Sequence, residues 1–252
     1  MSNTLKRMQK RKDKEKAKAK TGTGQLVSAT PAPAPANLPK ILIGVPSNRD
    51  LCKEFVASLM GLTRTVGIDN IVLMQNGMIN QCRDSIVKWA VQKGYEYIFW
   101  MDDDMIIPPN AITQLLSHDL DIVSGLYFGR GNYLPLMFDI QEDKEVEESF
   151  YSFQNHREYK DNDLMNVDAI GFGCVLTKVS ALLKVWNDER DGIGGTCFDF
   201  IGGLGEDLSF ALRCRQCGIE TWVDTSIKCG HIGKITVTED MYKALILKQE
   251  QH

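Results

Sequence analysis

The sequence predicts an α/β fold in which a mostly parallel central sheet is flanked by helices and preceded by a disordered N-terminal tail. Short apolar runs alternate with segments of helical period from residue 40 onward, an order typical of a parallel sheet with helices on both faces. The chain has 252 residues, of which 43% are hydrophobic and 25% charged. These values are close to globular averages and exclude a collagen-like fibre, a wholly disordered chain and a small disulfide scaffold. They fit one large domain, or two that share a core.

Residues 1–39 are predicted to form the disordered tail. They hold 9 Lys and Arg against 2 Asp and Glu, whereas the remaining residues hold 20 against 31. Alternating Ala and Pro from residue 30 favours an extended, solvated backbone, and such a segment buries too little apolar surface to offset its ordering entropy. The tail is either a solubilising segment or an electrostatic tether to nucleic acid, anionic lipid or an acidic partner. Because the rest of the chain is acidic, a wide basic surface for duplex nucleic acid is not expected there.

The sequence has no signal for the membrane or for an oxidising compartment. No apolar run reaches the ~20 residues of a membrane-spanning helix, and the basic N-terminus lacks the apolar segment of a secretory signal. The 7 cysteines are odd in number and scattered, which favours reduced thiols and a cytoplasmic location. Cys214 and Cys217 have no second CxxC pair with which to hold zinc.

The first half of the domain alternates regularly. Strands are predicted for short apolar runs at residues 40–46, 70–74, 95–101 and 121–127. Helices are predicted where apolar residues recur at helical spacing, at residues 50–62, 80–93 and 109–117. In the second of these helices, Asn80 is the expected N-cap and Gly94 the stop. Ile86, Trp89 and Ala90 are its expected core face, together with the stem of Lys93.

The second half is less regular. Residues 139–163 are acidic and polar and are expected to form a surface excursion. Residues 167–177 are predicted to form a strand with tight packing at Gly171 and Gly173. A loop with six glycines at residues 191–205 then precedes a helix at 206–217 and a strand at 220–223.

Three consecutive carboxylates follow the predicted strand at residues 95–101. In open α/β sheets, ligands bind at the carboxyl ends of the strands. Alternation along an extended chain sends Asp102 and Asp104 to the same side, with Asp103 between them. Two converging carboxylates repel each other unless a cation neutralises them, and oxygen ligands suit Mg²⁺ or Mn²⁺. The alternative is a solvated acidic turn that leads into the next helix.

Two further motifs lie downstream. Glu206 and Asp207 open a predicted helix after the glycine-rich loop, either as favourable charges in a first helical turn or as a general base for an acceptor hydroxyl. The helix dipole is expected to keep this carboxylate ionised and to weaken its basicity. His231 lies after the last predicted strand in the run Cys-Gly-His-Ile-Gly. It is either structural or a third ligand to a metal held by Asp104.

With these motifs in this order, the chain from about residue 40 to residue 233 resembles the GT-A glycosyltransferases. It is similar to the family 2 type and to its small stand-alone members in bacteria and bacteriophages. The matching residues are Val45, Pro46 and Ser47 at the first strand, Met101 to Asp104 as the DxD motif, Gly205 to Asp207 as the ED motif, and His231. The location would then be the cytoplasm, or the host cytoplasm if the chain is phage-encoded.

The resemblance implies a single GT-A type, Rossmann-like domain over residues 40–252. Residues 40–140 would be the nucleotide-sugar-binding half and residues 141–252 the acceptor and base half. The donor would be a nucleotide-sugar, with a UDP-sugar as the first expectation. Asp104 would coordinate Mn²⁺ or Mg²⁺ at the diphosphate, with Asp102 in the metal shell or on the ribose and His231 completing the coordination. Asp207 would be the base, with Glu206 orienting the acceptor.

The resemblance also implies residues around the donor. Pro46 and Ser47 would flank the nucleobase, and Asp103 would belong to the donor site. Asn80 and Arg83 match a helix start that relatives fill with polar donor-site residues, while Asp84 stands where many relatives have Asn.

The reaction and its acceptor are less specified. One base carboxylate with no evident second nucleophile favours inversion at the transferred sugar. The acceptor is unknown: a protein, a polysaccharide or a hydroxymethylated base of phage DNA reached through the basic tail. The alternatives to a transferase are a haloacid-dehalogenase-like phosphatase, a related nucleotidyltransferase and a non-catalytic binding module. Tyr127, Phe128 and Tyr133 either pack as core aromatics or stack on a sugar or base.

Overall fold

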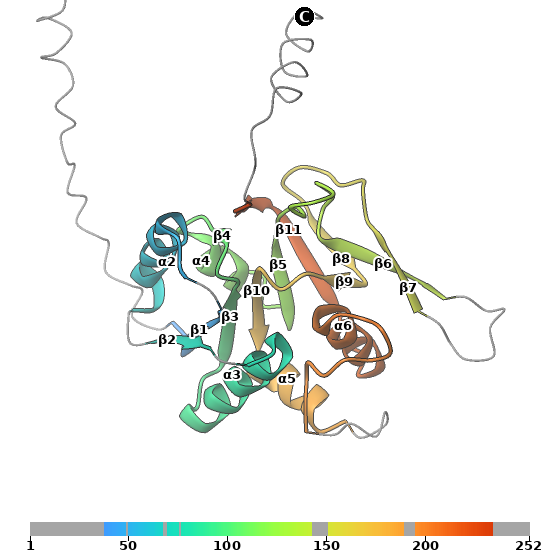
Figure 1. Ribbon diagram of the computed structural model, residues 1–252, viewed down its shortest axis with the longest axis horizontal. Coiled ribbons are helices and arrows are strands. Elements are labelled where there is room, and N and C mark those ends of the chain that lie inside the picture. The colour runs from blue at the N-terminus through green and yellow to red at the C-terminus, as the bar shows by residue number, and fades with distance from the viewer. Residues whose placement is uncertain are drawn as a thin grey trace, which may run out of the picture. The chain divides into compact units, whose positions relative to one another are not determined.

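A seven-stranded mixed sheet forms the centre of the fold (Figure 1). The computed structural model describes residues 38–48, 50–67, 70–75, 77–142, 151–188 and 195–233. In spatial order the strands are β2 (Ile71–Met74), β1 (Ile41–Pro46), β3 (Tyr97–Met101), β10 (Cys174–Lys178), β5 (Ile122–Leu126), β11 (Thr221–Lys228) and β8 (Leu164–Val167). The predicted tail at residues 1–39 lies outside the described residues except for Leu38 and Pro39, so its disorder and its partners stay predictions.

The strands mostly run in one direction, as predicted. β1 pairs in parallel with β2 and β3, and β5 pairs in parallel with β11. β10 lies between β3 and β5 and is antiparallel to both, and β8 is antiparallel to β11. β2, β1, β3, β5 and β11 therefore share one direction, and β10 and β8 are reversed.

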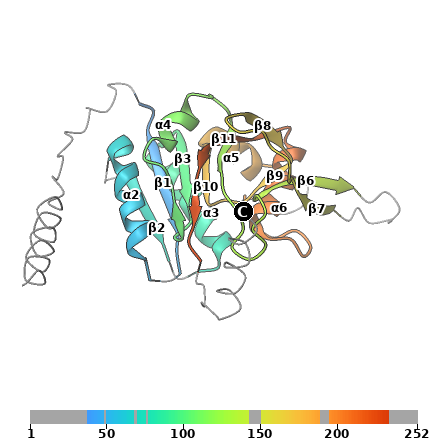
Figure 2. The same ribbon diagram turned by 90° about the horizontal axis from the view of Figure 1, so that it is seen from above.

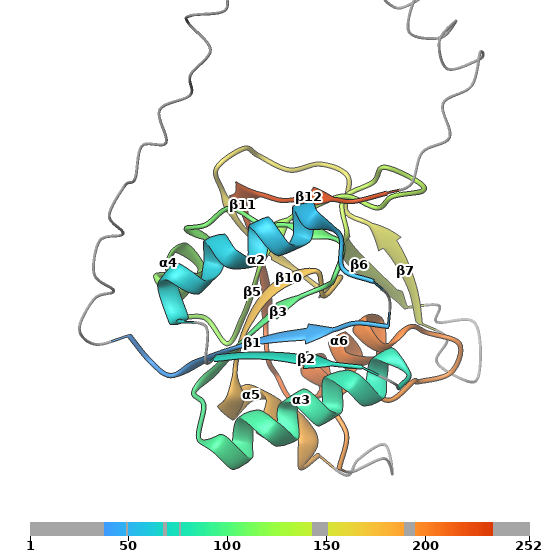
Figure 3. The same cartoon turned by 60° about the vertical axis from the view of Figure 1, so that its left-hand side comes forward.

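Helices cover both faces of the sheet. Figure 3 shows α2 (Lys53–Val66) and α4 (Ala111–Leu116) on one side and α3 (Ile79–Lys93) and α5 (Val179–Trp186) on the other. Alternate residues of β1 point to opposite faces of the sheet. Ile41 and Ile43 pack in the core with α2 and α4. Leu42 packs in the core with α3, α5 and α6 (Glu206–Gln216). This alternation is the period-two pattern of a strand buried on both faces.

The polar stretch at residues 139–163 was expected to be a surface excursion, but it contains two strands. β6 (Met137–Glu142) pairs with β7 (Tyr151–Asn155) and with β9 (Ala169–Ile170) in a separate three-stranded sheet. Figure 2 shows β6 and β7 on the opposite side of the molecule from α2. In β7 the half-buried Tyr151 and Phe153 alternate with the exposed Ser152 and Gln154, so the strand signal is a short two-residue alternation within a polar sequence.

Several boundaries differ from the sequence prediction. α3 begins at Ile79 with Met78 as its N-cap, so Asn80 lies in the first turn instead of capping it. Gly94 ends the helix in the left-handed conformation, with φ 67°, as predicted. The predicted core residue Trp89 is 41% exposed, because the buried face of α3 follows Cys82, Ile86 and Ala90 at a spacing of four.

The predicted strand at residues 167–177 is broken between β9 and β10. Side-chain atoms of Tyr127 would lie 2.3 Å from a Cβ at Gly171 and 3.0 Å from one at Gly173. Tight packing at these glycines was predicted and is confirmed, and it occurs where the chain leaves the sheet.

A short two-stranded pairing completes the edge at which ligands were expected. β4 (Met105–Ile106) pairs with β12 (Gly230–His231), and His231 lies opposite Met105. All seven cysteines lie in the described residues and are free thiols, as predicted. None of the described helices has the length and apolar character needed to cross a membrane.

Candidate active site

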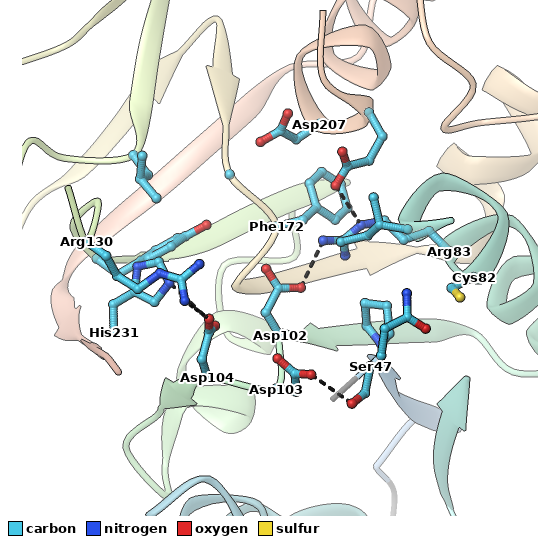
Figure 4. Close-up of a pocket in the computed structure, with 17 residues that line it drawn as sticks. Ser47, Cys82, Arg83, Asp102, Asp103, Asp104, Arg130, Phe172, Asp207 and His231 are labelled. Atoms are coloured by element: carbon cyan, nitrogen blue, oxygen red, sulfur yellow. Dashed lines mark hydrogen bonds and ion pairs between the residues drawn. The ribbon is translucent and has the colours of Figure 1, made fainter. Parts of the chain in front are cut away.

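A cavity of about 430 Å³ opens at the carboxyl ends of β1, β3 and β5. It contains the residues of all three sequence motifs, which come from distant parts of the chain (Figure 4). The predicted site residues that line it are Pro46, Ser47, Arg83, Asp102, Asp103, Asp104, Glu206, Asp207 and His231. Asn80 does not line it, because its buried side chain turns away and donates to Asp199 Oδ1 at 3.2 Å.

The three consecutive aspartates have three different partners. Asp103 Oδ2 accepts a hydrogen bond from Ser47 Oγ at 2.7 Å. Asp102 Oδ1 accepts one from Arg83 at 2.9 Å, and Asp104 lies against Arg130 and His231. The amide of Met105 donates to the Asp102 carbonyl at 3.2 Å, so the chain turns directly after β3 and the carboxylates spread along the cavity.

Arg83 links the DxD motif to the ED motif. Its side chain is 1% exposed. Nη2 donates to Asp102 Oδ1 at 2.9 Å, and Nε donates to Glu206 Oε1 at 3.4 Å. The guanidinium lies over the ring of Phe172, at 5.0 Å from its centroid. Burial opposes its charge, but the carboxylates of Asp102 and Glu206 outweigh burial and raise the pKa of Arg83. Nη1 has no hydrogen-bond partner among the described residues.

Arg130 is a site residue that sequence reasoning missed. Its Nη1 lies 2.7 Å from Asp104 Oδ2, and it belongs to the turn that follows β5. That turn is closed by hydrogen bonds from Tyr133 N to Gly129 O and from Gly129 N to Leu134 O. The only signal in the sequence was one cation between two glycines, after a strand at the expected edge.

His231 is oriented from both sides. Its Nδ1 donates to the carbonyl of Phe128 at 2.8 Å, and its Nε2 lies 3.4 Å from Asp104 Oδ1. The amide of Ile232 also donates to the Asp104 carbonyl, at 2.7 Å. Burial would lower the pKa of His231, but the Asp104 carboxylate and the Phe128 carbonyl outweigh it and raise the pKa.

Asp207 lies in the first turn of α6 and faces the same cavity. Burial, followed by the charge of Glu206, raises its pKa from 3.8 to about 6. The helix dipole was expected to weaken this base, but burial and the neighbouring carboxylate of Glu206 make it more basic. Glu206 points to Arg83, so the two acidic residues at the start of α6 have different surroundings.

Asp84, the residue after Arg83, does not line the cavity. Its Oδ1 accepts from the amides of Cys197 at 2.9 Å and Phe198 at 3.2 Å. The side chain therefore fixes to α3 the segment that leads into α6. This contact positions the start of α6, which carries Glu206 and Asp207.

Asp104, His231 and Asp102 are the candidate ligands for a divalent cation. Among the residues that the structure describes, no three His, Cys, Asp or Glu side chains converge as a metal site. Asp104 and His231 nevertheless direct a carboxylate oxygen and an imidazole nitrogen at each other. The Phe128 carbonyl holds the other imidazole nitrogen, as is usual for a metal-ligating histidine. Oxygen and nitrogen donors are the ligand types that Mn²⁺ accepts, and Mg²⁺ prefers oxygen; Asp102 lines the same cavity, where it is paired with Arg83.

The charge of the cavity also fits a cation. Five carboxylates line it, from Asp102, Asp103, Asp104, Glu206 and Asp207, and two arginines accompany them, Arg83 and Arg130. An anionic ligand such as a diphosphate would be repelled unless further positive charge entered with it.

The fold is similar to those of known structures, although the sequence is not similar to known families. No protein-family model matches the chain, and no curated protein matches its sequence. Among solved structures, it is similar to A197 from STIV, with a TM-score of 0.54 and 15% identity over 77% of this chain and 86% of that one. It is also similar to GalNAc-T7, in a crystal structure with UDP, GalNAc and Mn²⁺, with a TM-score of 0.53 and 11% identity over 80% of this chain. The chain has a GT-A fold.

The GT-A fold confirms the fold class that the sequence predicted, and at these identities the likeness concerns the fold alone. This chain spans 45% of the GalNAc-T7 chain.

Proposed function

We propose that this protein is a glycosyltransferase that moves a sugar from a nucleotide-sugar donor to an acceptor hydroxyl. One observation carries the proposal: Asp207, with a pKa near 6, faces the same cavity as the three aspartates that end β3. A carboxylate with a pKa close to neutral is suited to general base catalysis, and carboxylates at a strand end are suited to a cation at a diphosphate. The GT-A fold supports the combination.

The donor is inferred to be a UDP-sugar. The GalNAc-T7 structure holds UDP, GalNAc and Mn²⁺, and the present cavity offers Pro46 and Ser47 on the β1 side for a nucleobase. Asp103 fixes the Ser47 hydroxyl. Nη1 of Arg83 is buried beside Asp102 and has no hydrogen-bond partner among the described residues. An oxygen atom of the bound nucleotide-sugar would accept its hydrogen bond.

A divalent cation would be held by Asp104 and His231, with Asp102 beside them. When bound, it would supply Lewis-acid stabilisation of the leaving diphosphate. Arg83 keeps Asp102 in place, and the Phe128 carbonyl keeps the His231 ring in one orientation. These contacts preorganise the protein's own groups around the leaving-group position.

Asp207 would accept the proton of the acceptor hydroxyl as that oxygen attacks the anomeric carbon. Glu206 is paired with Arg83, so it would orient the acceptor and add negative charge to the site without taking the proton. With one base and no second carboxylate assigned as a nucleophile, the hydroxyl attacks opposite the diphosphate and the anomeric configuration inverts.

The experiment is a donor screen with UDP-, GDP-, TDP- and CMP-sugars in the presence of Mn²⁺ or EDTA. Thermal shift reports binding, because a ligand of the native state raises the unfolding midpoint, and nucleotide release reports turnover. We expect UDP-sugars with Mn²⁺ to give both signals. Asp207→Asn should keep the thermal shift and lose turnover. The matched control is Asp161→Asn, which removes an exposed carboxylate paired with Lys228.

Three results would contradict the proposal. The first is no thermal shift and no turnover with any sugar nucleotide. The second is turnover that survives in Asp207→Asn, which would remove the base assignment. The third is release of inorganic phosphate in place of UDP, which would identify a phosphatase.

A further inference from the structure

Arg130 is paired with Asp104, the carboxylate that a divalent cation would use. Its Nη1 lies 2.7 Å from Asp104 Oδ2, while His231 Nε2 lies 3.4 Å from Asp104 Oδ1. Both oxygens of Asp104 therefore face nitrogen atoms. A guanidinium at this distance and a metal ion bound to the same carboxylate would repel each other strongly in a buried site.

The two arginines of the cavity differ in how firmly they are held. Arg83 is 1% exposed and is clamped between Asp102 and Glu206. The side chain of Arg130 is 43% exposed, and Asp104 is its one ion-pair partner among the described residues. The guanidinium of Arg130 can therefore leave its carboxylate without breaking a second ion pair.

Arg130 also has space into which it can move. It lines the main cavity and also a second cavity of about 330 Å³. Phe128, Tyr133 and Gly233 are among the residues that line the second cavity. The backbone of its turn is held by hydrogen bonds between Gly129 and its neighbours. The side chain can thus swing over a fixed turn, toward either cavity.

We propose that Arg130 and the divalent cation compete for Asp104. In the empty site, Arg130 neutralises the carboxylate. Once the cation displaces it, its guanidinium remains at the wall of the main cavity and binds the donor diphosphate, for which the planar fork of arginine is well suited. This inference rests on the proposed function and adds a residue that couples cation binding to donor binding.

The test measures Mn²⁺ affinity directly, by the electron paramagnetic resonance signal of free Mn²⁺, in wild type, Arg130→Ala and Arg130→Lys. No sugar donor is present. We expect Arg130→Ala to bind Mn²⁺ about tenfold more tightly, the scale of one charge-assisted hydrogen bond. Arg130→Lys should fall between wild type and Arg130→Ala, because an ammonium keeps the charge without the guanidinium fork.

A control variant distinguishes the loss of the contact between Arg130 and Asp104 from a general change in the charge of the protein. Lys228→Ala removes an exposed cation that precedes His231 by three residues and pairs with Asp161. At about 0.5 M salt, long-range effects are screened, so only Arg130→Ala should retain tighter Mn²⁺ binding. In a second arm, UDP is titrated into Mn²⁺-saturated protein, and Arg130→Ala should bind UDP about tenfold more weakly than wild type.

Equal or weaker Mn²⁺ binding by Arg130→Ala at high salt overturns the competition. Unchanged UDP affinity overturns the second role of Arg130. If either occurs while wild type turns over UDP-sugars with Mn²⁺, the inference fails and the proposed function stands. If neither wild type nor Arg130→Ala binds Mn²⁺ or UDP, both fail.

Discussion

Replacing Asp207 with asparagine should make the protein more stable while it removes transfer. The folded chain holds this carboxyl at a pKa of about 6 against 3.8 in the unfolded chain. At about 1.36 kcal/mol per pKa unit, the ionised side chain costs the folded state about 3 kcal/mol at pH 7. An asparagine is never ionised and can still accept from the Leu208 amide, which lies 2.8 Å from Oδ1. The full gain of about 3 kcal/mol is an upper bound, since the side chain is half-buried.

The stability advantage of Asp207→Asn over wild type should increase with pH. Below pH 3.8 the carboxyl is protonated in both states, and the variant has no advantage. Between pH 3.8 and about 6 the folded state holds a proton that the unfolded state has lost, so wild-type stability falls as pH rises. Above about pH 6 the difference is constant. Urea unfolding at pH 4, 5 and 7 should therefore show an advantage of Asp207→Asn that grows with pH. Each kcal/mol is worth about 2–4 °C in Tm at this size.

The comparison variant is Asp161→Asn, whose carboxylate is 67% exposed. It should change stability by less than about 1 kcal/mol at every pH. A loss of stability in Asp207→Asn at pH 7, or an advantage that does not shrink as the pH falls to 4, would refute the argument that burial and Glu206 raise this pKa.

Three further outcomes follow from the same geometry. The kcat/KM of the proposed transfer should fall about tenfold per pH unit below about pH 6, because the base is then protonated; a pH–rate profile without this limb contradicts the base assignment. Arg83→Met should destabilise the fold by about 3–5 kcal/mol in urea unfolding, since it leaves Asp102 and Glu206 without their counter-charge. Gly44→Ala should cost about 1–3 kcal/mol in the same assay, because its Cβ would lie 2.7 Å from Ile86 Cγ2.

The parts of the fold that could be predicted are those with a strong local pattern. The apolar runs at β1 and β3 are buried on both faces, and such strands are continuous in sequence. Asp102, Asp103 and Asp104 follow β3 directly, and Glu206 and Asp207 open α6, so their common edge followed from the rule for ligand sites in α/β sheets. The direction of β10 could not be predicted, because it depends on where the chain returns to the sheet.

The parts of the site that were missed depend on tertiary contacts. β4 and β12 are two residues each, too short for a periodic signal, yet their pairing sets His231 beside Asp104. Arg130 has no motif around it, and its role depends on the shape of one turn. The raised pKa of Asp207 required knowledge of burial, since the helix dipole alone suggested the opposite sign.

The guanidinium of Arg83 connects the β3 side of the cavity with the α6 side. Asp102 and Glu206 pair with different nitrogens of one guanidinium, so a ligand that moves this group toward Asp102 weakens its contact with Glu206 at the start of α6. The two substrates would then bind with a coupling free energy, and thermodynamics requires that each change the affinity of the other by the same factor.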